Sequence, residues 1–275
     1  MLQYTKSLEA NNKFKKSAAQ GRLYFPTVEF RKLGKRGKRL IFAPTMDDLD
    51  AMHAVALDAI KLASTRVQKL KARRNWLMLR ILARTGLREA ELVGDKRLPG
   101  LRVTDLVPSR NCLLIRGKGW GGRHPEIEEQ PVDPQTMTSI QTHITSRRLQ
   151  NDDKLFPVST RQVQNIIKDI ALEANKRRRC QNCQKWVQIS EQKCECGSTQ
   201  FGPPACPYAK DLAPHRIRAF FITQVTASQG IALAKELARH RRIATTERYV
   251  HLDAEAKRTA YEKLFNKPTD AGDQK

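Results

Sequence analysis

Two close pairs of cysteines restrict how residues 176–208 can fold. Within RRRCQNCQKWVQISEQKCECGSTQF the pairs are Cys180-x-x-Cys183 and Cys194-x-Cys196, with ten residues between them. Two cysteine pairs at such a separation are typical of a tetrahedral zinc site. A polar segment of this length cannot build a core of its own, so we expect a structural zinc ion to hold it together as a zinc-ribbon-like insert.

The same segment leaves some alternatives open. The second pair has one residue between its cysteines where two are usual, so Cys206 could replace one of these ligands. Disulfides are not expected in a cytoplasmic protein, and the beginning of the chain does not have the pattern of a secretory signal. The arginines before Cys180 would either contact phosphate or lie in solvent. Cys112, within an apolar run, is expected in the core.

The net charge of the chain indicates a polyanionic partner. Lysine and arginine total 51 against 28 aspartate and glutamate, which gives a formal charge of +23 over 275 residues. Such an excess repels itself unless phosphates neutralise it, so nucleic acid is the first candidate partner. A membrane surface is the second, but the charge is spread along the chain and no apolar run is long enough to span a bilayer. We expect a cytoplasmic protein, associated with the nucleoid if DNA is the partner.

The basic residues are densest at the beginning of the chain. Residues 1–40 contain eleven lysines and arginines against two acids, with glycines between them and few apolar residues. We therefore expect residues 1–43 to form a basic arm that grips DNA, although a terminus without function is the alternative. A single domain of residues 44–275 would follow, with the cysteine insert inside it.

The sequence pattern of this domain is mainly that of helices. Thr45 is a helix N-cap followed by acids, Gly86 ends a second helix, and Ser159 or Thr160 caps a later one. Strand-like runs occupy 101–107 and 111–117. Helical patterns cover 44–60, 69–84, 88–94, 133–149, 159–176, 215–228, 232–240 and 253–265. The expected fold class is mainly α (α+β), with one small antiparallel sheet and the inserted ribbon.

Cationic and nucleophilic side chains recur in four short motifs. Breaking a phosphodiester without a metal needs a nucleophile, cations for the phosphate oxygens and an acid for the leaving oxygen. A tyrosine, with a free pKa of about 10, serves as nucleophile only where positive charge favours its phenolate. The candidates are Arg88 in ARTGLREAEL, Lys118 in IRGKGWGG, His215 and Arg218 in PHRIRAFF, and His240 and Tyr249 in ARHRRIATTERYVHL.

These motifs resemble those of the tyrosine recombinases, the phage-integrase and Xer-like family. The boxes TGLREAEL, GKGWGGR, HRIR and ARHRRIATTERYVH follow one another in the family's order, and the last has eight residues between its histidine and its tyrosine. The resemblance covers roughly residues 44–265 apart from the insert. It implies the helical catalytic domain of that family, and a site-specific recombinase or integrase that cuts and rejoins DNA strands through a 3′-phosphotyrosyl intermediate. Such enzymes occur on mobile genetic elements.

The resemblance also implies a role for each candidate. Tyr249 would attack the scissile phosphate, and Arg88 and Arg218 would bind its non-bridging oxygens. Lys118 would be the general acid, His215 would assist proton transfer and His240 would hydrogen-bond the phosphate. Glu91 would orient the site. The partners would be double-stranded DNA and further copies of the chain, assembled as a tetramer, and the chemistry would need no cofactor.

The sequence departs from the family pattern in several places. Arg239 stands where the family usually has glycine, and the lysine hairpin continues into the acidic EIEEQPVD. About 44 residues precede the catalytic part, where family members commonly carry a separate DNA-binding domain. Alternative interpretations are a type IB topoisomerase, a telomere-resolvase-like enzyme and a non-catalytic, zinc-containing DNA-binding regulator. Arg88 could also merely pair with Glu89 or Glu91.

Overall fold

The structure is a computed structural model, and it describes residues 43–117 and 127–247, all of which belong to one unit, residues 41–275. The basic arm, Lys118, Tyr249 and the helix expected at 253–265 lie outside these residues. No helix of the described ranges is long and apolar enough to cross a membrane.

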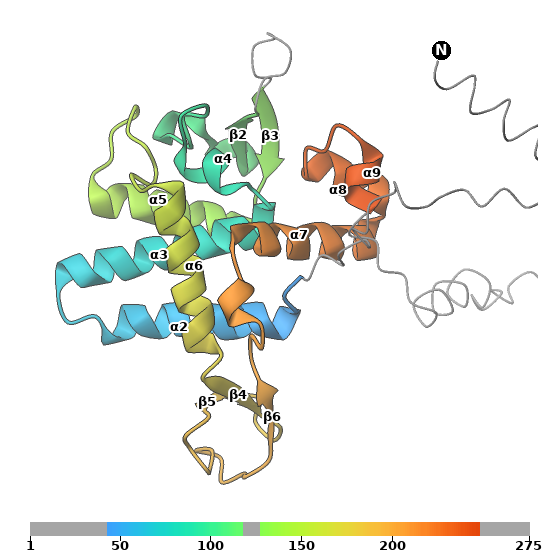
Figure 1. Ribbon diagram of the computed structural model, residues 1–275. Helices are drawn as coiled ribbons and strands as arrows, with labels where there is room; N and C mark the ends of the chain where they lie inside the picture. The colour runs from blue at the N-terminus through green and yellow to red at the C-terminus, as the bar shows by residue number, and fades with distance from the viewer. Residues whose placement is uncertain (1–42, 118–126, 248–275) are drawn as a thin grey trace, which may run out of the picture. The chain divides into compact units, whose positions relative to one another are not determined.

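Eight α-helices and two small sheets make up the described part of the chain (Figure 1). The helices are α2 (Met46–Leu62), α3 (Arg66–Thr85), α4 (Glu89–Val93), α5 (Pro134–Arg147), α6 (Thr160–Ala174), α7 (Pro214–Gln229), α8 (Ile231–Leu237) and α9 (Ile243–Glu247). The first sheet contains β1 (Leu106–Val107), β2 (Cys112–Arg116) and β3 (Ile127–Pro131); the second contains β4 (Arg177–Cys180), β5 (Trp186–Gln188) and β6 (Phe201–Pro204).

Reciprocal side-chain caps fix where the first two helices begin. At α2 the Thr45 hydroxyl accepts from the Asp48 backbone N–H at 3.1 Å, and the Asp48 carboxylate accepts from the Thr45 N–H at 2.8 Å. Thr65 and Gln68 form the same box at α3, which therefore begins at Arg66 and not at residue 69 as the apolar pattern predicts. Gly86 ends α3 in the left-handed conformation with φ 61°, as expected.

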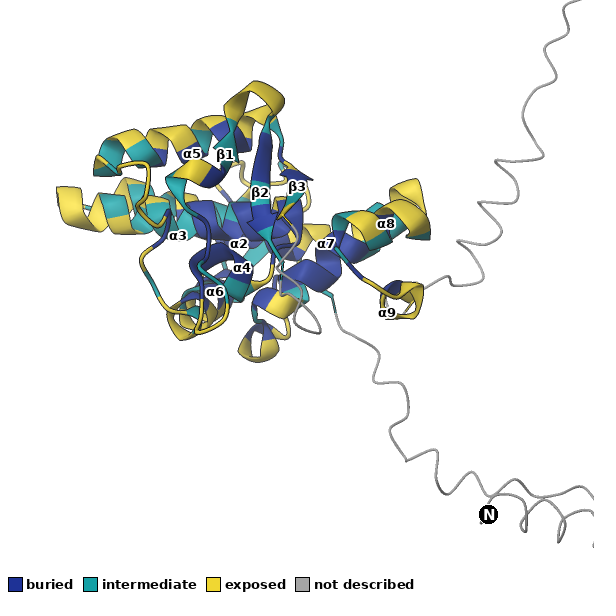
Figure 2. Cartoon of the chain, turned by 90° about the horizontal axis from the view of Figure 1, so that it is seen from above, coloured by how far each residue is buried: buried dark blue, intermediate teal, exposed yellow. Residues whose placement is uncertain are grey.

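The core lies around α3, which packs against α2, α5 and α7. Figure 2 shows buried residues on the inward surfaces of these helices and exposed residues outside. Each buried leucine or methionine contributes about 1.5 to 3 kcal/mol, so this cluster is the main source of stability. Its fully buried large side chains include Met52, Leu77, Met78, Leu79, Ile81, Leu82, Leu87, Leu92 and Phe156.

The first sheet is antiparallel in the order β1-β2-β3, with Leu113 opposite Gln130 and Arg116 opposite Ile127. The strand predicted over 101–107 is reduced to its last two residues, because Val103–Asp105 forms a 3-10 turn. The Asp105 carboxylate stabilises that turn by accepting from the Arg102 backbone N–H at 2.8 Å.

The second sheet is the cysteine insert, antiparallel in the order β5-β4-β6. It follows α6 and lies on the opposite side of α2 from α4, β2 and β3 (Figure 1). The fold class predicted from the sequence, mainly helical with small antiparallel sheets, is confirmed.

Candidate active site and cysteine cluster

Arg88 occupies the N-cap of α4, directly after the turn that Gly86 begins. Its guanidinium Nη1 lies 2.6 Å from Glu91 Oε1, and its backbone N–H donates to Glu91 Oε2 at 2.8 Å. The Arg88 side chain nevertheless remains 49% exposed, whereas that of Glu91 is 1% exposed. Pairing with Glu91 therefore orients Arg88 without burying it, and the guanidinium can still meet an anion from solvent.

Arg218, in α7, is buried and fixed by backbone carbonyls. Its Nη1 donates to the carbonyl of Gly86 and its Nη2 to the carbonyl of Ala238. The glycine is needed here, because a Cβ at residue 86 would collide with the Phe221 ring of α7. Close packing of α7 on the end of α3 thus brings Arg218 to the turn that precedes Arg88.

His240 lies in the connection between α8 and α9, and it is buried. Its Nδ1 is 2.9 Å from the Thr246 hydroxyl, and its backbone N–H donates to the Lys235 carbonyl. Burial lowers the pKa of His240 to about 4, and the charges of Arg218, Arg88 and Arg239 act in the same direction. The ring is therefore neutral at pH 7, and its orientation is set by Thr246.

Glu91 is the carboxylate at which the arginines meet. Besides its contacts with Arg88, it accepts from Arg239 Nη2 at 2.8 Å, and the Arg239 side chain is 4% exposed. Burial alone would raise the pKa of Glu91, but the charges of Arg239, Arg88 and Arg218 hold it below its usual range. Glu91 is therefore ionised at neutral pH.

Among the residues that the structure describes, positive charge exceeds negative charge at this site. Arg88, Arg218 and Arg239 carry three positive charges around the single carboxylate of Glu91, and His240 adds none. Guanidinium groups held in place by protein contacts bind phosphate oxygens without reorganising. The geometry therefore suits a phosphate group or another oxyanion.

His215 is the second residue of α7, one turn before Arg218, and it is exposed. Partial burial and the neighbouring Arg216 lower its pKa, while Glu89 of α4 acts against them. Among the described residues, no hydrogen bond or ion pair joins His215 to Arg88, Glu91 or Arg218.

Sequence reasoning found four of the residues that form or flank this site, namely Arg88, Glu91, Arg218 and His240, and the structure brings these together. Lys118 and Tyr249 lie outside the described residues, which stop at Gly117 and Glu247 on the respective sides. Sequence reasoning missed Gln130 and Thr246, for which the sequence offers no signal. It treated Arg239 as part of the surroundings, although its departure from the expected glycine was a signal.

The four predicted zinc ligands form a cluster. The sulfur atoms of Cys180, Cys183, Cys194 and Cys196 all lie within 4.8 Å of one another. The sulfurs of Cys183 and Cys194 are 3.5 Å apart, and those of Cys180 and Cys196 are 3.6 Å apart. Four thiolates about 2.3 Å from a tetrahedral ion are about 3.8 Å apart, so the donor set fits a metal ion of that kind. These cysteines could hold a metal ion.

Cys206, the alternative ligand, does not belong to this cluster. Its sulfur lies 3.5 Å from the Asp48 carbonyl, and its backbone N–H donates to the Asp48 carboxylate at 2.7 Å. It is buried at the end of the insert and ties that end to the first turn of α2. Of the two ligand sets that the spacing left open, the geometry favours the one without Cys206.

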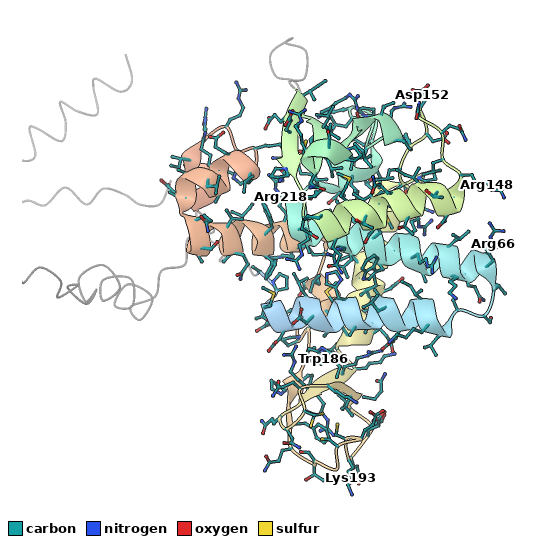
Figure 3. The ribbon with its side chains drawn as sticks, turned by 180° about the vertical axis from the view of Figure 1, so that it is seen from behind. Arg66, Arg148, Asp152, Trp186, Lys193 and Arg218 are labelled. Atoms are coloured by element: carbon teal, nitrogen blue, oxygen red, sulfur yellow. The ribbon has the colours of Figure 1, made fainter. Side chains whose placement is uncertain are left out.

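The arginines before Cys180 dock the insert on α2. Arg177 Nη1 lies 2.7 Å from Asp58, and Arg179 lies 3.3 Å from Asp47 and 3.4 Å from Asp50. The Arg179 guanidinium also stacks over the Trp186 ring, 4.6 Å from its centroid, and Arg178 stacks over Phe201. Figure 3 shows Trp186 beside α2 and Lys193 at the far tip of the insert.

Comparisons with known proteins agree with this fold. No protein-family model matches the chain, and no curated protein matches its sequence. Among solved structures it is similar to XerA recombinase (TM-score 0.54, 18% identity, 84% of this chain and 66% of that one). It is also similar to XerH site-specific recombinase bound to a difH substrate (0.54, 17%, 84% and 55%).

A third similar structure is the Tn1549 transposon integrase in complex with transposon right-end DNA (TM-score 0.57, 15% identity, 90% of this chain and 75% of that one). The chain spans 66% and 55% of the lengths of the XerA and XerH structures. The described residues therefore have the fold of the recombinase and integrase structures, as the resemblance of the four sequence motifs implies.

Proposed function

We propose that the protein is a site-specific DNA recombinase or integrase that cuts and rejoins DNA strands with Tyr249 as nucleophile. The observation that carries this proposal is the cluster of Arg88, Arg218 and His240 around one ionised carboxylate. Three sequence motifs far apart in the chain meet there, in a fold shared with recombinases and integrases.

The phosphate-binding step rests on the two family arginines. Arg88 is oriented by Glu91 and half exposed, so it can take one non-bridging oxygen without rearrangement. Arg218 is fixed through the carbonyls on both sides of the site and supplies the second positive charge. Neutral His240 donates a hydrogen bond to the same phosphate. Together they stabilise the charge that develops on the phosphate oxygens.

The chemical step is a transfer between oxygens. As the Tyr249 hydroxyl gives up its proton, with His215 assisting that transfer, its oxygen attacks phosphorus. The bond from phosphorus to the 5′ oxygen breaks, and Lys118 donates a proton to that oxygen. The products are a 3′-phosphotyrosyl link and a free 5′-hydroxyl. Attack by a 5′-hydroxyl of another strand reverses these bond changes, so strands are exchanged without an external energy source.

Zinc is the metal that we propose for the cysteine cluster. Four sulfur ligands leave no open position, so the ion would be structural and would take no part in the reaction. The insert would depend on it for folding, whereas the catalytic domain has its own core. We further propose double-stranded DNA as the partner and a homotetramer as the assembly that exchanges strands.

A nicked suicide substrate tests the function directly. When the strand beyond the cleavage site is short enough to diffuse away, the covalent adduct accumulates and can be counted on a denaturing gel. The wild-type protein is expected to form the adduct, and Tyr249→Phe to abolish it while DNA affinity is largely kept. Tyr208, which is exposed in the insert's connection to α7, provides the matched control: Tyr208→Phe should form the adduct normally.

The outcomes separate the alternatives. Sequence-specific binding without any adduct would support a non-catalytic regulator. An adduct with relaxation of any supercoiled plasmid but no exchange between two duplexes would support a topoisomerase, and closed hairpin products a telomere-resolvase-like enzyme. An adduct that persists in Tyr249→Phe would refute the role of this tyrosine.

A further inference from the structure

Arg239 adopts a backbone conformation that arginine rarely takes. Its φ is 54°, in the left-handed region that glycine enters without penalty. Such a conformation persists at a side chain with a Cβ only when surrounding contacts hold it. The contacts of the Arg239 guanidinium therefore indicate what the unusual residue does at this position.

These contacts join parts of the site that are distant in sequence. Arg239 Nη2 donates to Glu91 of α4 at 2.8 Å, and Nη1 donates to the side-chain oxygen of Gln130 in β3. Gln130 is buried and lies opposite Leu113 of β2, the strand that leads toward Lys118. His240 follows Arg239 in the chain. Ala238 precedes it, and the Ala238 carbonyl accepts from Arg218.

We infer that Arg239 is a positioning residue that locks Glu91 and strand β3 to the connection carrying His240. This inference rests on the proposed function, because it assigns Arg239 a part in the same reaction. The planar fork of arginine can reach two acceptors at once, which a lysine ammonium cannot do in the same geometry. Arg239 therefore sets how Arg88, strands β2 and β3, and His240 lie relative to one another before DNA binds.

The charge of Arg239 also keeps Glu91 ionised. The pKa of Glu91 is raised by burial and lowered by Arg239, Arg88 and Arg218, and the lowering prevails. Without Arg239, burial is less well opposed and the pKa of Glu91 rises. A protonated Glu91 would no longer form an ion pair with Arg88, so the site would lose its arrangement as the pH falls. This gives the inference a readout that simple destabilisation does not share.

Two substitutions separate geometry from charge. Arg239→Gly suits the left-handed backbone but removes both contacts, so the rate of adduct formation at saturating substrate should fall about 10- to 100-fold, as for other groups that orient reactive residues. DNA affinity should change little. The rate of adduct formation by Arg239→Gly should also decline toward acid pH, across a range where the wild-type rate is flat. Arg239→Lys keeps the charge, so its pH profile should match the wild type while its rate lies between the two.

Arg80→Gln is the matched control. Arg80 is also an arginine paired with an acid, with its side chain 12% exposed and 3.0 Å from Asp133, but it joins α3 to α5 outside the site. Its adduct rate should equal that of the wild type, even if its melting temperature falls.

Several results would overturn the inference. One is a wild-type rate and pH profile in Arg239→Gly; another is a lower melting temperature in both Arg239 variants with an unchanged rate per folded molecule. If Arg239→Gly does not fold, a wild-type rate in Arg239→Lys has the same meaning. A wild-type protein that forms no adduct would instead contradict the proposed function itself.

Discussion

Two groups of arginines in this protein have the same chemistry and opposite surroundings. In the first, Arg88, Arg218 and Arg239 converge on one carboxylate and on backbone carbonyls. In the second, the arginines of β4 are matched one by one with acids of α2 or with aromatic rings. Among the described residues, three arginines share one carboxylate in the first group, whereas three aspartates pair with the arginines of the second.

The difference separates arginines that can bind an anion from arginines that join two parts of the protein. Guanidinium groups that share a carboxylate, such as that of the half-exposed Arg88, can still bind an anion from outside the protein. Guanidinium groups with their own acids join two parts of the protein. The arginine run before Cys180 therefore does not need phosphate to explain it, although sequence reasoning considered only phosphate and solvent.

Removing the proposed zinc ion should have the largest effect on stability, and this effect should be confined to the insert that carries the second group. Structural zinc sites supply on the order of 10 kcal/mol of folding free energy. Chelation, or Cys180→Ser, should unfold residues 176–208 and free the β4 arginines from α2, while the helical core stays folded. Hydrogen exchange of the insert and metal analysis measure this. Purified protein without zinc, or an insert that stays protected after chelation, would contradict the expectation.

Replacing Arg218 should have the next largest effect, on the reaction. Loss of one fixed donor to a transition-state oxyanion typically lowers the rate about 10²- to 10³-fold. We expect Arg218→Gln to lose adduct formation by this amount, and Arg178→Gln in the second group to leave it unchanged. Equal losses in both variants would erase the distinction between the two groups.

Acid pH should lower the stability of the protein through His240, which lies among the arginines of the first group. The pKa of His240 is lowered to about 4 by burial and by neighbouring arginines, below its value of about 6.5 in an unfolded chain. Between these values the unfolded state binds more protons, so stability is full above about pH 6.5 and falls on the order of 1 to 3 kcal/mol toward pH 4. An NMR titration of the His240 ring tests this, and a pKa near 6.5 would contradict a ring buried beside the arginines of the first group.

The smallest effect should come from the exposed pairs of the insert. Arg179 pairs with Asp47 and Asp50, whose side chains are 67% and 51% exposed. Such pairs are worth about 0 to 1 kcal/mol, so Arg179→Gln should loosen the insert slightly and leave adduct formation intact. The fluorescence of Trp186 during mild denaturation reports this loosening. A loss of adduct formation in Arg179→Gln would show that this group serves DNA after all.

The sequence by itself determined what depends on neighbours in the chain. Thr45 and Ser159 as caps, Gly86 as a helix end and the two cysteine pairs were predictable, because capping and ligand spacing involve residues a few positions apart. Arg88, Arg218 and His240 were predicted as site residues because their motifs resemble those of a known family. The start of α3 was predicted three residues too late, because the first turn of this helix is mostly polar and apolar periodicity gives no signal there.

The tertiary structure decided the contacts that join distant segments. Arg239 binds Glu91, 148 positions away in the sequence. Cys206 binds Asp48, 158 positions away, and therefore does not belong to the cysteine cluster. The pairing of Arg177 with Asp58 belongs to the same class. No local pattern specifies such contacts, because the distance between two side chains far apart in sequence is set by how the helices between them pack.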